Sequence, residues 1–148
     1  MDTRQVVERV VDAPAEAMFD LLTDPSRHHE LDGSGTVLGL VSGERITAVG
    51  QRFRMSMDRP GRSDYRSDNI VTILEPGTTV GWATTEVDGE HLGYTWTFRL
   101  APDGPDRTVV THVYDWSDVV DPDLFVRFPQ VSYAEMMRTV DRLAAAVA

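Results

Sequence analysis

A histidine and a tyrosine near the end of the chain are the strongest candidates for proton-transfer chemistry. His112 and Tyr114 lie two residues apart in a β-branched run, Thr108 to Trp116, that predicts a strand. Side chains two apart on a strand share a face. A histidine beside a tyrosine in an apolar pocket can act as a general acid–base pair. The alternative, which we favour, is that both are hydrogen-bonded cavity or core residues that position a ligand.

Other kinds of catalytic chemistry are excluded by residue type. The sequence has no cysteine, which excludes disulfides, thiolate zinc sites and cysteine nucleophiles. All 14 basic residues are arginine, so no lysine amine is present to form a Schiff base. His28 and His29 are adjacent, and on a helix they point about 100° apart, which suits one metal poorly. We therefore expect neither a metal site nor a cofactor.

Charge and hydropathy limit the partners of the chain. Fourteen basic residues against 24 acidic ones give a net charge of −10, which argues against nucleic acid and against anionic membrane surfaces. No stretch has the apolar length of a signal peptide or of a membrane-spanning helix. We expect a cytoplasmic protein, monomeric or homodimeric, whose partner is a small molecule.

Aromatic residues gather in the middle of the chain, on segments with a period of two. Tyr94, Trp96 and Phe98 alternate on one segment and form one aromatic face. Tyrosine and tryptophan need a polar partner when buried, so such a face suits either a plain core or the wall of a planar ligand's site. The candidate ligand-binding residues are Met55, Met57, Tyr65, Asn69, Trp82, Tyr94, Trp96, Phe98, His112, Tyr114, Trp116, Met136 and Val140.

The elements that carry these residues follow from periodicity and turn signals. Residues 4–11 read as a strand, a helix follows Pro14, and Asp24-Pro25 begins a second short helix that ends near Leu31. From residue 36 the period changes to two, which predicts six further strands at 36–41, 52–57, 65–74, 80–87, 92–100 and 108–116. Asp88-Gly89 is the strongest hairpin signal, as a type I′ turn.

The last segment predicts one long helix. Ser132 and Glu135 have the spacing of a capping box. An apolar stripe follows it, formed by Met136, Met137, Val140, Leu143, Ala144 and Val147. Arg138, Asp141 and Arg142 face the other way. A strongly twisted antiparallel sheet must curl around its one long helix. The prediction is an α+β helix-grip fold over residues 1–148 as one domain, with a cavity between sheet and helix.

This order of elements, with particular residues at its turns, resembles a known superfamily. The matching pieces are Val11-Asp12-Ala13-Pro14, Asp24-Pro25-Ser26-Arg27-His28, Leu31-Asp32-Gly33-Ser34-Gly35, Glu75-Pro76-Gly77, Trp96-Thr97-Phe98-Arg99-Leu100 and Tyr114-Asp115-Trp116-Ser117. The chain resembles the START-like or Bet v 1-like (SRPBCC) superfamily, in its bacterial polyketide cyclase/dehydrase and lipid-transport branch. The resemblance implies a helix-grip fold with the Val110 face pointing inward.

Two functions fit this resemblance, because its members bind lipids or cyclise polyketides. The first is binding of a small hydrophobic or amphipathic ligand in the cavity. The alternative is a polyketide cyclase or dehydratase that folds its substrate and moves protons through His112 or Tyr114. A chaperone-interacting module would need an exposed apolar patch, which the sequence does not reveal. We favour binding, since the predicted inner face is thin in polar groups and offers no nucleophile.

Overall fold

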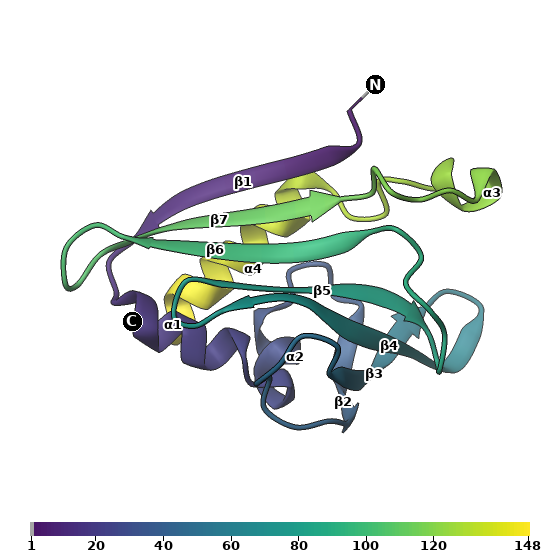
Figure 1. Ribbon diagram of the computed structural model, residues 1–148, viewed down its shortest axis with the longest axis horizontal. Coiled ribbons are helices and arrows are strands. Elements are labelled where there is room, and N and C mark those ends of the chain that lie inside the picture. The colour runs from purple at the N-terminus through teal and green to yellow at the C-terminus, as the bar shows by residue number, and fades with distance from the viewer. Residues whose placement is uncertain (1) are drawn as a thin grey trace.

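The computed structural model describes residues 2–148, in which seven strands form one antiparallel sheet in the order β1-β7-β6-β5-β4-β3-β2 (Figure 1). The first strand pairs with the last, so β1 and β2 form the two edges. The strands are β1 (Arg4–Val11), β2 (Val37–Ser42), β3 (Arg52–Arg59), β4 (Arg62–Glu75), β5 (Thr79–Glu86), β6 (Thr95–Pro102) and β7 (Thr108–Asp115). The α+β helix-grip prediction, with six or seven antiparallel strands, is confirmed.

The helices lie on the concave side of this sheet, except for α3 (Pro122–Phe125), which lies beyond the end of β7 (Figure 1). The others are α1 (Ala15–Leu22), a 3₁₀ turn at Pro25–Arg27, α2 (His28–Leu31) and α4 (Tyr133–Ala146). Figure 1 shows α4 crossing behind β6 and β7, and α4 packs against β1, β7, α1 and α2. Register shifts interrupt the β2–β3, β3–β4 and β4–β5 pairs, and such irregularities increase local twist and help the sheet curve.

Helix α4 forms as its sequence signals predict. Ser132 is the N-cap: its hydroxyl accepts a hydrogen bond from the Glu135 backbone N–H (3.1 Å), and the Glu135 carboxylate accepts one from the Ser132 N–H (3.0 Å). Met136, Val140 and Leu143 are fully buried along its inner face. No helix in residues 2–148 is long and apolar enough to cross a membrane.

The two arginines on the outer side of α4 do more than face solvent. Arg138 donates from Nη1 to the Gly33 carbonyl oxygen (2.8 Å), and Arg142 donates from Nη1 to the Asp32 carbonyl oxygen (2.9 Å). These bonds satisfy carbonyl groups that follow α2, and they tie this loop to α4. The sequence pattern marks both positions as polar but does not show their partners.

Two local features differ from the sequence predictions. Helix α3 was not predicted, although Asp121 accepts from the Asp123 N–H (2.9 Å) as its N-cap. The prediction of a type I′ hairpin turn at Asp88-Gly89 is wrong. Such a turn needs positive φ at both residues, but only Asp88 has it (φ 58°). The next strand, β6, begins only at Thr95. The backbone at Asp88 is held by a side chain of β4, because the buried Asp68 carboxylate accepts a hydrogen bond from the Asp88 N–H (2.9 Å).

The packing of α4 gives a direct test by substitution. Leu143→Ala should lower the free energy of unfolding by about 2–5 kcal/mol, because it leaves a cavity in a site that is 0% exposed. Asp141→Ala, which removes the exposed ion pair with Arg9, should change it by no more than about 0.5 kcal/mol. Urea melts of both variants measure the difference, and equal losses would contradict the assigned helix orientation.

Candidate ligand-binding cavity

A cavity of about 530 Å³ lies between the concave face of the sheet and the helices. Strands β3 to β7 supply its wall, α2 and α4 border it, and the segment that precedes α4 closes one end with Gln130 and Val131. A volume of this size accommodates a drug-sized small molecule. The cavity is therefore the site in which the sequence candidates have to be placed.

Most of the predicted ligand-binding residues are brought together by strand register. Directly opposed pairs place Met57 beside Tyr65 on β3 and β4, and Phe98 beside His112 on β6 and β7. Since every strand alternates its side chains, one register sets a whole face. The predicted residues that line the cavity are Met55, Met57, Tyr65, Asn69, Trp82, Tyr94, Trp96, Phe98, His112 and Met136.

Tyr114, Trp116 and Val140 are not among the lining residues, which corrects the expectation for these three. The Tyr114 ring stacks on Trp96, with the ring centroids 3.9 Å apart and an angle of 8° between the ring planes. The Tyr114 hydroxyl accepts a hydrogen bond from the Gln130 N–H (3.1 Å). Burial raises the pKa of this hydroxyl further above its usual range. The segment before α4 covers this end of the sheet, so the cavity does not present His112 and Tyr114 as a pair.

An aromatic surface runs along one wall of the cavity. The ring centroids of Trp82 and Phe98 are 5.9 Å apart. Phe98 stacks on His112, with the ring centroids 3.9 Å apart and an angle of 9° between the ring planes. His28 extends the surface, stacking on Trp82 at 4.7 Å. Aromatic faces of this kind favour stacking or edge contacts with a planar ring. Phe53, which contacts both His28 and Trp82, was missed, although its spacing from Met55 and Met57 places it on their face.

Two buried histidines border this surface, and both are neutral near pH 7. Burial lowers the pKa of His28 and of His112 to about 4, against the opposing effect of hydrogen bonds to backbone carbonyls. Nε2 of His28 donates to the Leu22 oxygen (2.7 Å), and Nδ1 of His112 donates to the Thr97 oxygen (3.1 Å). Each neutral ring then keeps a lone pair on its other nitrogen as an acceptor.

The position of His28 in the site was not foreseen, because a short helix gives no periodic signal for the direction of one side chain. His29 is exposed and is not among the lining residues. In residues 2–148 no group of three or more histidine, cysteine, aspartate or glutamate side chains is arranged to hold a metal ion.

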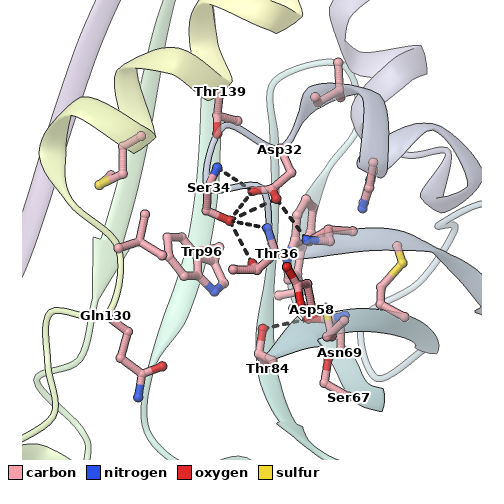
Figure 2. Close-up of a pocket in the computed structure, with 18 of the residues that line it drawn as sticks. Asp32, Ser34, Thr36, Asp58, Ser67, Asn69, Thr84, Trp96, Gln130 and Thr139 are labelled. Atoms are coloured by element: carbon pink, nitrogen blue, oxygen red, sulfur yellow. Dashed lines mark hydrogen bonds between the residues drawn. The ribbon is translucent and has the colours of Figure 1, made fainter. Parts of the chain in front are cut away.

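A strip of polar residues lies beside the aromatic surface on the same wall, on β4 and β5. Thr84 donates from its hydroxyl to Asn69 Oδ1 (2.7 Å), as Figure 2 shows, and Ser67 lies beside Asn69 on the same strand face. The Ser67 hydroxyl is buried, and no partner for it is found among the described residues. The inner face is thus richer in polar groups than expected. Thr84 is two residues from Trp82 on β5, so strand alternation alone predicts that it shares the inner face with Trp82.

The loop after α2 borders the cavity and forms part of its rim. Ser34 donates from its hydroxyl to Asp32 Oδ1 (2.7 Å), and the Val37 N–H donates to Asp32 Oδ2 (3.0 Å) (Figure 2). The Gly33 N–H donates to the Thr139 hydroxyl on α4 (2.8 Å). Asp32 and Ser34 are therefore occupied in holding the loop, which fixes the position of the rim.

A curved sheet closed by a helix around an aromatic-lined cavity defines a ligand-binding fold. A family model described as polyketide cyclase / dehydrase and lipid transport matches residues 3–148, and the chain belongs to this family. This confirms the resemblance to the START-like or Bet v 1-like superfamily.

Related proteins agree with this assignment. An uncharacterized protein of Mycobacterium tuberculosis is 37% identical over 106 residues, which cover 72% of this chain and 44% of that protein. The chain thus matches less than half the length of this relative.

Solved structures share the fold at low sequence identity. A protein from Chromobacterium violaceum has a TM-score of 0.71 at 21% identity, covering 99% of this chain and 98% of the other. Norcoclaurine synthase from Thalictrum flavum, solved with dopamine and hydroxybenzaldehyde, has a TM-score of 0.62 at 20% identity, covering 97% of this chain and 86% of the other.

Close contact between the rim loop and α4 predicts that Gly33 cannot be replaced. A Cβ at Gly33 would lie 2.4 Å from the Glu135 carbonyl oxygen and 2.6 Å from the Thr139 backbone nitrogen, neither of which can move without moving α4. Gly33→Ala should therefore cost about 1–3 kcal/mol of stability. The matched control is Gly39→Ala on β2, where a Cβ meets nothing within 4 Å. Thermal melts in which both variants behave alike would contradict this packing.

The buried histidines predict a loss of stability in mild acid. Unfolded histidines take up protons near pH 6.5, whereas native His28 and His112 resist until about pH 4. Between these values the unfolded state binds more protons, so the free energy of unfolding should fall as pH falls. The loss should be on the order of 1–3 kcal/mol for each histidine by pH 4, and stability should be fully retained above pH 6.5.

Urea melts from pH 7.5 to pH 4.5 measure this slope, and His112→Phe should make it shallower. Asp68 has its pKa lowered below 3.8, chiefly by the hydrogen bond from Arg54, so its contribution is lost at more acidic pH, outside this range. An unchanged slope in His112→Phe would show that the native ring protonates like an unfolded one.

Proposed function

We propose that this protein binds a small amphipathic molecule with a planar aromatic part in the cavity of about 530 Å³. The aromatic wall carries the proposal: Phe98 stacks on His112, Trp82 lies tilted beside Phe98, and all three rings line the cavity. Plain core packing would cover these faces with aliphatic side chains from the helix. Here they border open volume, and a planar ligand would remove that apolar surface from water.

The polar lining supports an amphipathic ligand over a purely apolar one. Ser67 and Asn69 face the cavity from β4, and the side chains of His28 and His112 also line it. Buried polar groups without partners are costly, so a ligand with matching polar atoms would be preferred over a hydrocarbon of equal size.

The alternative, a polyketide cyclase or dehydratase that uses His112 and Tyr114, has less support. A base whose conjugate acid has a pKa of about 4 accepts protons weakly at neutral pH, because general bases work best with pKa values near the operating pH. The Tyr114 hydroxyl is engaged by the Gln130 N–H and lies behind Trp96. Binding needs neither group to transfer a proton.

Filling the cavity should weaken binding of an apolar probe. Thr84→Phe places a ring in the cavity and should weaken binding of N-phenyl-1-naphthylamine at least about tenfold, since the dye and the new side chain compete for one volume. Thr111→Phe, on the outer face of β7, is the matched control and should leave affinity unchanged. Dye fluorescence measures binding, and equal affinity in both variants would place the dye elsewhere.

Replacing His112 separates binding from catalysis. His112→Phe keeps a ring that can stack on Phe98 and removes a polar group from the wall, so affinity for the neutral dye should hold or rise. A protein that uses His112 as general acid or base would instead lose about 10²–10⁴ of its turnover. The measurements are dye titration and product analysis with polyketide-like substrates; turnover that falls in this range would favour the enzyme.

A further inference from the structure

We propose, building on the binding function above, that the cavity selects planar aromatic molecules that carry an uncharged carbonyl group. Ser67 and Asn69 would hold this group, with the Ser67 hydroxyl and the Asn69 side-chain N–H donating to its oxygen. The aromatic wall explains why a ring fits the cavity. The two polar residues on β4 would select the kind of polar atom that the ligand carries.

Ser67 carries the first part of the argument. Its side chain lines the cavity, its exposed fraction is 2%, and its hydroxyl is the one buried side-chain polar atom without a hydrogen-bond partner in residues 2–148. Its cross-strand neighbour on β3 is Met55, whose thioether is a weak acceptor. Native proteins pair nearly all buried polar atoms, so this hydroxyl, which lines the cavity, is available to hydrogen-bond a polar atom of a ligand.

Asn69 supplies the second donor. The Thr84 hydroxyl donates to Asn69 Oδ1 (2.7 Å), which occupies the amide oxygen and fixes the orientation of the side chain (Figure 2). The Asn69 amide nitrogen is then the group available to a ligand, and it is a donor. Residues 67 and 69 are two apart on one strand, so their Cα atoms lie about 7 Å apart on the same face. Both side chains can reach one oxygen that has two lone pairs.

The lining offers no cation beside Ser67 and Asn69 that is free of other contacts among the described residues, which favours an uncharged group. Donation from a hydroxyl and a neutral amide satisfies a carbonyl oxygen, whereas a buried carboxylate would need a positive partner. Arg59 is the arginine found among the described lining residues, and it stands over the Tyr65 ring at 5.0 Å while donating to the Tyr65 hydroxyl (3.2 Å). His28 and His112 are neutral. An aromatic ketone or quinone therefore fits better than an aromatic acid.

The test compares three naphthalenes that differ in one substituent. The probes are 2-acetylnaphthalene with a neutral carbonyl, 2-ethylnaphthalene without one, and 2-naphthoate with a charged one. Equilibrium dialysis gives the affinity of each for the wild-type protein and for Ser67→Ala and Asn69→Ala. Ser56→Ala, on the outer face of β3, is the matched control. Ser67→Ala removes a group that bonds nothing in the protein, so the fold should be retained.

The expected result is a change in selectivity. In Ser67→Ala and in Asn69→Ala, affinity for 2-acetylnaphthalene should fall about three- to tenfold relative to 2-ethylnaphthalene, the worth of one hydrogen bond in each case. Affinity for 2-ethylnaphthalene should hold or rise, and Ser56→Ala should behave as wild type. In the wild-type protein 2-naphthoate should bind more weakly than 2-acetylnaphthalene.

Two outcomes would overturn the carbonyl proposal and leave the binding function intact. One is an unchanged ratio of ketone to hydrocarbon affinity in both variants, with both probes still bound. The other is tighter binding of 2-naphthoate than of 2-acetylnaphthalene, which would assign an anionic ligand. If Thr84→Phe leaves the affinity for 2-ethylnaphthalene at its wild-type value, the cavity itself is not the binding site, and both proposals fail.

Discussion

One long helix has to cover the concave face of a seven-stranded sheet, and the rest of the structure depends on this mismatch in area. Helix α4 packs through Met136, Val140 and Leu143, and its strand contacts are with β1 and β7. Helix α1 contacts β5 and β6, and His28 of α2 packs on Trp82, so the short helices cover only part of the inner face of β3 to β6. Twist prevents the sheet from flattening onto the helix, so the uncovered part encloses a cavity.

The loop after α2 shows how closely the covering elements are held. Gly33 lies directly against α4, and Arg138 and Arg142 from α4 hydrogen-bond to the carbonyls of this loop. These contacts join the first helices to the last one across the rim. The rim of the cavity is thus fixed relative to α4.

Strand β4 serves both sides of the sheet at its middle. Ser67 and Asn69 face the cavity, while Asp68 points to the outer face, where Arg52 and Arg54 pair with its carboxylate (3.3 and 2.7 Å). Asp68 also accepts from the Asp88 N–H and so holds the segment between β5 and β6. Three successive polar residues of β4 are thus buried in different surroundings. Asp68 pairs with two arginines, Asn69 bonds to Thr84, and Ser67 faces the cavity.

Local patterns in the sequence are enough to predict the order of the strands, their antiparallel pairing and the long C-terminal helix, but not α3. Period-two alternation, the Ser132–Glu135 capping box and the apolar stripe are local signals, and local physics is sufficient to interpret them. Alternation also grouped Tyr94, Trp96 and Phe98 on one face. The family followed from residues at the turns.

Tertiary structure alone decided which of these inward residues meet open volume. Tyr114 and Trp96 are directly paired across β6 and β7, yet one is covered by the segment before α4 and the other lines the cavity. His28 enters the site from a short helix, where its ring is held by the Leu22 carbonyl at the end of α1 and by Trp82 on β5, which is distant along the chain. Periodicity reports the face of an element, whereas exposure within that face depends on which distant segment packs over it.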